Sequence, residues 1–208
     1  GVAHGDELGR TLGAHDARYL RDRFVRDFGI PENKIIYLDY GFPIQYLTPP
    51  RAAAQPRNFT FGYIGTHIPA KGVNMLIKAF KQIEQPVSLK IFGRDNGQST
   101  NALKKMAADA KNPIEFCGEY RNQDLVRKVF EAVDCIVVPS IWAENSPLVI
   151  HEAQQCRIPV ITANFGGVAE FGVDGGRPGF PENELVEFLG VHWRGTPRAP
   201  YTAHRSSA

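Results

Sequence analysis

The sequence predicts an α/β protein with a Rossmann-like parallel sheet and helices on both faces of that sheet. Short apolar runs alternate with segments of helical periodicity along most of the chain. Strands buried on both faces read as continuous apolar runs, and a strand–helix–strand order requires parallel pairing with right-handed crossovers. The expected strands are 59–64, 87–92, 114–117, 134–138 and 158–162. The expected helices are about 72–84, 100–111, 121–132 and 147–156.

The chain divides into sections of different composition. Residues 16–28 have apolar side chains at helical spacing, and the stripe ends at Gly29, which is typical of a helix C-terminus. A short strand is expected at 34–38, and one further helix at 182–189 in a tail that otherwise lacks periodicity and predicts little fixed structure. The expected sections are residues 1–45, a linker at 46–58, the main α/β domain at 59–172 and an atypical tail at 173–208.

Composition narrows the class of protein. The 208 residues are 43% apolar and 22% charged, with a formal net charge of +2, which predicts a soluble globular protein. No basic block is present, so nucleic acid is not an expected partner. Three widely spaced cysteines predict reduced thiols, and six histidines show no metal-ligand spacing. We expect a cytoplasmic protein with no metal site, and a peripheral place at a membrane is the alternative.

One segment carries the strongest chemical signal. The run P-S-I-W-A-E-N-S-P-L-V-I-H-E-A at 139–153 places two carboxylates eight residues apart, across the start of a helix. Ser146 and Pro147 predict the helix start, because serine is a good cap and proline suits the first helical position. Glu152 then lies about 7.5 Å along the helix axis. Together with Glu144 in the preceding loop, this spacing suits a ligand with a phosphate at the helix tip and a ribose diol further along.

Each carboxylate also has a plain structural explanation. An acidic residue beside a helix N-terminus is electrostatically favoured, so Glu144 alone needs no function. Glu152 is harder to explain in this way. It shares a stripe with Leu148 and Gln155, while the other apolar residues of the helix face the core.

Other loops after strands carry glycines and charges. Gly65 permits a ligand to approach the backbone closely, and Lys71 opposes the dipole of the next helix unless an anion lies nearby. A turn glycine beside a solvated lysine is the alternative. The pair Gly166–Gly167 either brings amides to a ligand or makes a simple turn. No G-x-G-x-x-G follows the first strand, which disfavours a nicotinamide-dependent dehydrogenase.

Taken in order, these segments resemble the retaining family 4 (group 1) glycosyltransferases of the GT-B fold, over residues 16–172. The segments are G-T-H-I-P-A-K-G (65–72), I-F-G-R-D-N-G (91–97), E-F-C-G (115–118), V-P-S-I-W-A-E-N-S-P-L-V-I-H-E-A (138–153), I-P-V-I (158–161) and G-G-V-A-E (166–170). The resemblance implies that residues 59–172 are the donor-binding half of a GT-B fold. It implies that residues 1–45 are a remnant of an acceptor-side domain, most of which is missing.

The resemblance also implies a chemistry and a set of roles. A nucleoside-diphosphate sugar would be the donor, with retention at the anomeric carbon and neither a cofactor nor a metal ion. Glu144 would bond the donor-sugar hydroxyls, Lys71 would meet the diphosphate, and Glu152 would bond the ribose; the implied catalytic residues are Glu144 and Lys71. The implied donor-binding residues are Gly65, Thr66, Lys71, Arg94, Gly118, Glu119, Tyr120, Glu144, Asn145, Ser146, Leu148, Val149 and Glu152.

The sequence departs from the family pattern at three positions. Thr66 stands where the family usually has an arginine, and Arg94 is the candidate to replace that charge. Pro147 has no N–H, which leaves Leu148 and Val149 as the helix-tip donors. Arg157 stands where glycine is usual.

Three functions follow from the sequence. The leading prediction is the donor domain of a glycosyltransferase that is catalytically incomplete alone and has an unknown acceptor, which is a glycan, a lipid or a small molecule. The second is a non-catalytic nucleotide-sugar-binding module that acts with a partner. The third is another Rossmann-like enzyme such as an epimerase.

Overall fold

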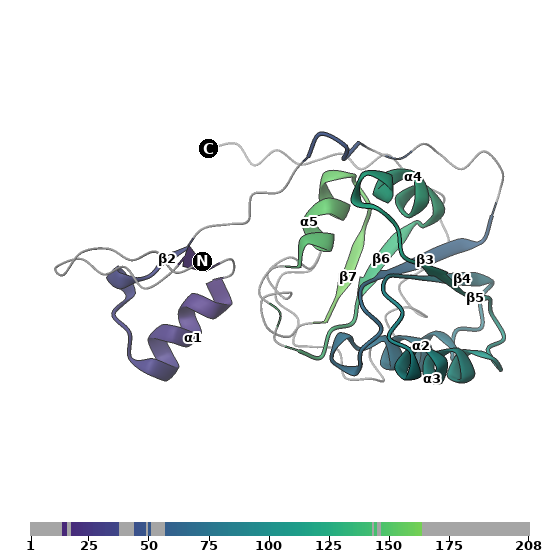
Figure 1. The fold of residues 1–208 in the computed structure, drawn as a ribbon, viewed down its shortest axis with the longest axis horizontal. Coiled ribbons are helices and arrows are strands. Elements are labelled where there is room, and N and C mark those ends of the chain that lie inside the picture. The colour runs from purple at the N-terminus through teal and green to yellow at the C-terminus, as the bar shows by residue number, and fades with distance from the viewer. Residues whose placement is uncertain are drawn as a thin grey trace.

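A computed structural model of the chain describes residues 14–15, 18–37, 44–48, 50, 57–142, 144 and 147–163. Its centre is a parallel five-stranded sheet with the order β5-β4-β3-β6-β7 (Figure 1). The strands are β3 (Phe59–Ile64), β4 (Val87–Phe92), β5 (Ile114–Gly118), β6 (Cys135–Val138) and β7 (Val160–Thr162). The predicted fold class is confirmed, and β3 and β4 span the residues that the sequence predicted.

Helices cover both faces of this sheet, as predicted. The helices α2 (Val73–Phe80) and α3 (Gln98–Ala107) lie on one face, and α4 (Leu125–Lys128) and α5 (Leu148–Gln155) lie on the other (Figure 1). Short 3-10 turns flank them: η2 (Pro69–Lys71), η3 (Asn122–Asp124) and η4 (Phe130–Ala132). The helix predicted at 121–132 is therefore formed by three pieces, η3, α4 and η4. Val129, between α4 and η4, has φ −112° and ψ −62°, outside the usual helical values.

Each face of the sheet has its own apolar core. On the side of α2, the fully buried side chains include Phe61, Leu76, Phe80 and Leu89. On the side of α5, a second cluster brings Phe130 and Ile150 together with Leu47, which precedes the sheet in the chain. Two-sided burial is the physical reason for the apolar runs of the strands.

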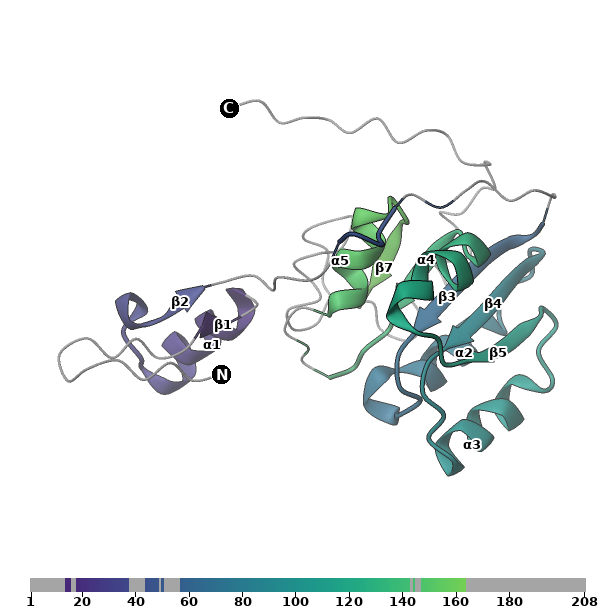
Figure 2. The ribbon, with the colours of Figure 1, turned by 45° about the horizontal axis from the view of Figure 1, so that its top comes forward.

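The first described elements form a separate unit. The helix α1 (Arg18–Phe28) is followed by η1 (Glu32–Lys34), and β1 (Ala14–His15) pairs in parallel with β2 (Ile36–Tyr37). This unit lies apart from the five-stranded sheet in both views (Figures 1 and 2). The predicted helix is confirmed from Arg18, whereas the predicted strand 34–38 is shorter because Lys34 belongs to a 3-10 turn. No side chain of α1 is fully buried: Leu20 and Phe24 are partly buried, and Phe28 is 70% exposed.

Several predictions lie outside the described residues. They concern Gly166–Gly167, the helix at 182–189 and the tail at 173–208. The section boundaries proposed from composition also stay predictions.

Candidate functional site

The strand order places the predicted site residues at one end of the sheet. After β3 the chain moves outward through β4 and β5, and it then returns to the other side of β3 as β6. In open α/β sheets, ligands bind beyond the carboxyl ends of the strands, at the point where the strand order reverses. Here that point lies between β3 and β6, whose following loops carry Lys71 and Glu144.

The loops after β3, β4 and β5 are connected through backbone hydrogen bonds. The Gly65 N–H donates to the Phe92 carbonyl at 3.1 Å, and the Gly93 N–H donates to the Gly118 carbonyl at 2.9 Å. A Cβ atom at Gly93 would lie 2.0 Å from the Gly65 carbonyl oxygen. Glycine is therefore required for the close approach of the first two loops.

The loops after β3 and β6 are connected even more closely. The Ile141 N–H donates to the Ala70 carbonyl at 3.1 Å, and the Ser140 hydroxyl oxygen lies 3.2 Å from the same carbonyl oxygen. Gly72 has φ +70°, and a Cβ atom there would lie 1.8 Å from the Pro139 carbonyl oxygen. The turn that carries Lys71 is thus held directly against the loop that leads to Glu144.

Lys71 and Glu144 form an ion pair at this junction. The Lys71 ammonium donates to Oε1 of Glu144, and the Ser140 hydroxyl donates to the same oxygen at 2.9 Å. The Glu144 side chain is 16% exposed and that of Lys71 is 35% exposed. Burial, and secondarily the charge of Glu144, raises the pKa of Tyr63. Lys71 lies at the start of a helix, where a positive charge is unfavourable unless an anion is nearby, and Glu144 is such an anion. The sequence did not predict this pairing.

Glu152 has different partners. Its Oε1 lies 3.5 Å from the Tyr46 hydroxyl, and burial raises the pKa of the Glu152 carboxyl. Burial, with a smaller effect of the Glu152 charge, also raises the pKa of Tyr120, whose ring meets Phe92 edge to face at a centroid distance of 6.4 Å. The structure therefore brings Glu152 and Tyr120, both predicted site residues, near each other. It adds Tyr46, which sequence reasoning missed.

The start of α5 differs from the prediction. Pro147 has φ −62° and ψ 123°, so it occupies the cap position in extended conformation, and Leu148 is the first helical residue. The cap of the helix therefore falls on Pro147, one residue later than predicted. The Ile150 N–H bonds to the Pro147 carbonyl at 3.0 Å, which leaves the amides of Leu148 and Val149 at the tip. Asn145 and Ser146 lie outside the described residues.

The other two departures from the family pattern, Thr66 and Arg157, and the candidate replacement Arg94 also have defined surroundings. The Thr66 carbonyl accepts hydrogen bonds from the Tyr63 hydroxyl at 3.1 Å and from the Ile68 N–H at 2.9 Å. The exposed Arg94 lies 4.0 Å from Glu119, so these two predicted site residues pair across neighbouring loops. Arg157 follows α5 with φ +60°, a left-handed conformation that favours glycine.

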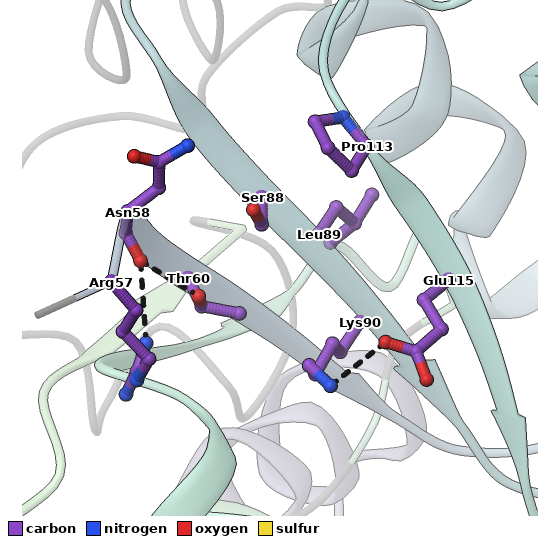
Figure 3. Close-up of a pocket in the computed structure, with 8 residues that line it drawn as sticks. All are labelled: Arg57, Asn58, Thr60, Ser88, Leu89, Lys90, Pro113 and Glu115. Carbon is purple, nitrogen blue, oxygen red and sulfur yellow. Dashed lines mark hydrogen bonds and ion pairs between the residues drawn. The ribbon is translucent and has the colours of Figure 1, made fainter. Parts of the chain in front are cut away.

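A hollow lies at the opposite end of the sheet. Its volume is about 230 Å³, and it is lined by Arg57, Asn58, Thr60, Ser88, Leu89, Lys90, Pro113 and Glu115 (Figure 3). Lys90 pairs with Glu115 at 2.8 Å, and Arg57 pairs with Asp134. Arg57, Asn58 and Pro113 precede β3 and β5, and the other lining residues lie within β3, β4 and β5. None of the predicted site residues lines the hollow.

Two absences concern only the described part of the chain. It holds no group of three or more His, Cys, Asp or Glu side chains arranged to bind a metal ion. It also holds no helix with the length and apolar character needed to cross a bilayer.

Comparisons with known proteins agree with the fold and show the family. The family model described as glycosyl transferases group 1 matches residues 58–188. A GDP-mannose-dependent monoacylated alpha-(1-6)-phosphatidylinositol monomannoside mannosyltransferase of Corynebacterium glutamicum is 31% identical over 112 residues, which cover 50% of this chain and 29% of that protein. A D-inositol 3-phosphate glycosyltransferase of a Mycobacterium species is 31% identical over 140 residues, which cover 62% of this chain and 31% of that protein. The chain thus spans about a third of these relatives.

Solved structures show the same architecture. A glycosyltransferase from Rickettsia africae superposes with a TM-score of 0.73 at 19% identity, covering 85% of this chain and 51% of that one. The Anabaena protein HepE, solved in complex with UDP and glucose, superposes with a TM-score of 0.69 at 22% identity, covering 86% of this chain and 52% of that one. At these identities the likeness shows the fold.

Proposed function

This chain belongs to the group 1 glycosyltransferases, and we propose that its five-stranded unit binds a nucleoside-diphosphate sugar as the donor for sugar transfer with retention. The observation that carries the proposal is the Lys71–Glu144 ion pair at the switch point of the sheet. The pair supports the proposal because it sets a lysine ammonium and a carboxylate side by side at the end of the sheet where ligands of such folds bind. No metal ion has a part in this proposal.

The diphosphate would bind between Lys71 and the tip of α5. A helix N-terminus offers amide donors and a partial positive charge to a phosphate, and here the amides are those of Leu148 and Val149. A lysine ammonium adds a charge-assisted bond. Positive charge at this position would stabilise the departing nucleoside diphosphate, which is the charge that develops in the transition state.

The two acids would bind the two sugars of the donor. Glu144 already accepts bonds from Lys71 and Ser140, and its carboxylate would accept bonds from the transferred sugar. The half-buried Glu152 lies in the second turn of α5 and would accept bonds from the ribose. Tyr120, in the loop after β5, would lie near the base.

A non-catalytic nucleotide-sugar module is the second candidate. Thr66 favours it, because this residue brings no charge to the diphosphate and its carbonyl is used by Tyr63 and Ile68. Arg94 would supply the charge if the chain is catalytic. We also propose an acceptor-side partner domain and a cytoplasmic location, with a place at the membrane surface. The phosphatidylinositol acceptor in the name of one relative supports the place at the membrane.

Calorimetric titration tests donor binding. UDP, GDP, UDP-glucose and GDP-mannose are titrated into the chain and into the variants Lys71→Ala and Glu152→Ala. We expect each variant to weaken the binding of the best ligand roughly tenfold or more, since bonds to charged groups contribute about 1.5–3 kcal/mol. Lys78→Ala, on the exposed side of α2, is the matched control. Unchanged affinity in both site variants would refute the proposal. A second experiment joins the chain to a complete amino-terminal domain and assays sugar transfer. Transfer would support the enzyme, and its absence would support the non-catalytic module.

A further inference from the structure

The segment 44–48 belongs physically to the five-stranded unit that follows it. Leu47 is 5% exposed and lies in the same apolar cluster as Ile150 and Ala153 of α5. A turn fixes its conformation, because the Leu47 N–H donates to the Ile44 carbonyl at 2.9 Å. In Figure 2 this dark-blue segment runs beside α5. Leu47 therefore anchors its neighbour Tyr46 at the surface of that helix.

Tyr46 approaches Glu152 from this anchored position. The two residues are 106 positions apart, and the Tyr46 hydroxyl donates to Oε1 of Glu152 at 3.5 Å. Burial raises the pKa of Glu152, and the Tyr46 bond acts in the opposite direction by favouring the carboxylate. The charge of Glu152, after burial, also raises the pKa of Tyr46. Each group thus influences the other directly.

We propose that Tyr46 is a positioning residue for ribose recognition, which holds one carboxylate oxygen of Glu152 so that the other can accept bonds from the ribose hydroxyls. The inference rests on the proposed function, in which Glu152 binds the ribose. A glutamate side chain has several rotatable bonds, and a donor that fixes one oxygen reduces the freedom lost when a ligand binds. A half-buried carboxylate also needs such a donor.

Tyr46 lies outside the part of the chain that the family model matches, which begins at residue 58. Preference for a ribose over a deoxyribose would then depend on a segment that precedes the nucleotide-binding fold. The same contact would make that segment respond to whether a nucleotide is bound.

The test compares ribonucleotides with deoxyribonucleotides. UDP and GDP, and their 2′-deoxy forms, are titrated into the chain, Tyr46→Phe, Glu152→Ala and the double variant. Phenylalanine keeps the ring and its packing and removes only the hydroxyl. We expect Tyr46→Phe to weaken binding of the ribonucleotide about 3- to 10-fold and of the deoxynucleotide less than about 2-fold. In the Glu152→Ala background, Tyr46→Phe should have no further effect. Tyr19→Phe, on α1, is the matched control.

The outcomes separate the two proposals. If Glu152→Ala removes the ribose preference and Tyr46→Phe leaves it intact, Tyr46 is not a positioning residue and the proposed function stands. Equal weakening of both nucleotide forms by Tyr46→Phe would also overturn the inference, because it indicates a packing effect. If Glu152→Ala changes neither affinity nor preference, the proposed role of Glu152 fails and this inference fails with it.

Discussion

Lys71 and Glu144 are 73 residues apart in sequence and form an ion pair that joins the loops after β3 and β6. The negative charge of Glu144 therefore already balances the positive charge of Lys71. Under the proposed function, a diphosphate that binds Lys71 would have to compete with a carboxylate, and Glu144 would exchange a lysine for sugar hydroxyls. Donor binding at this site would then involve an exchange of partners as well as the gain of new bonds.

Replacing Glu144 by glutamine should strengthen the binding of nucleoside diphosphates. The change frees Lys71 and removes a negative charge beside the phosphates, which is expected to tighten UDP or GDP binding roughly 3- to 10-fold. The advantage of the sugar nucleotide over the diphosphate should decrease, since glutamine is a poorer acceptor for sugar hydroxyls. Calorimetry with UDP and UDP-glucose, and with GDP and GDP-mannose, measures both effects. Weaker diphosphate binding in this variant would contradict the competition.

Gly72→Ala should destabilise the fold strongly. The new methyl group would lie 1.8 Å from the Pro139 carbonyl oxygen, in a backbone with φ +70°. Strain and overpacking together predict a loss of about 2–4 kcal/mol in the free energy of unfolding, measured in urea. Gly118→Ala is a matched control, because its φ is +73° and a Cβ there meets nothing within 4 Å. Gly118→Ala should lose only about 1 kcal/mol. Equal losses in the two variants would show that the contact of residue 72 with the Pro139 carbonyl is unimportant.

His67 should make stability depend on pH. The side chain is 2% exposed, its Nδ1 lies 3.0 Å from the Thr100 hydroxyl, and its Nε2 has no partner among the described residues. Burial lowers the pKa of His67; nearby Asp95 raises it and Lys104 lowers it. The unfolded chain therefore binds a proton more readily, and stability should fall as the pH drops below about 6.5.

The dependence of the free energy of unfolding on pH shows whether His67 is the titrating group. One proton corresponds to a loss of at most ~1.4 kcal/mol per pH unit. We expect urea unfolding between pH 7 and pH 5 to show this loss in the natural sequence and a smaller slope in His67→Leu. An unchanged slope in that variant would assign the pH dependence to other groups.

Arg157→Gly should stabilise the protein. Arg157 has φ +60° just after α5, and a side chain in this conformation costs about 1 kcal/mol relative to glycine. The urea midpoint should rise, with an unchanged denaturant slope. Gln155→Gly, in the last turn of the same helix, should lower the midpoint because glycine is a poor helix former there. A lower midpoint for Arg157→Gly would mean that contacts of the arginine outweigh its backbone strain.

The strands and their order of appearance followed from the sequence because burial on both faces requires continuous apolar runs. Segment boundaries were less predictable. The helix expected at 121–132 is interrupted at Val129, although the apolar spacing continues through it. The described loop residues Lys71, Arg94, Glu119 and Glu144 follow β3, β4, β5 and β6, and parallel strands bring their carboxyl ends to one end of the sheet.

The contacts between distant residues could not be predicted. Nothing local in the sequence indicates that Lys71 meets Glu144, or that Tyr46 meets Glu152 across 106 residues. Both pairs arise from packing of whole loops, such as the fit of Gly72 against Pro139. The position of Pro147 was also misjudged by one residue, because a proline is compatible both with the cap and with the first helical position.

The burial of Leu47 has a practical consequence for handling this protein. A gene fragment that starts at residue 57, just before β3, would omit the Leu47 side chain, which fills space against α5. Such a shortened product would present an apolar depression to water and invite self-association. The smallest piece worth expressing should therefore begin before Ile44, upstream of the first strand of the large sheet.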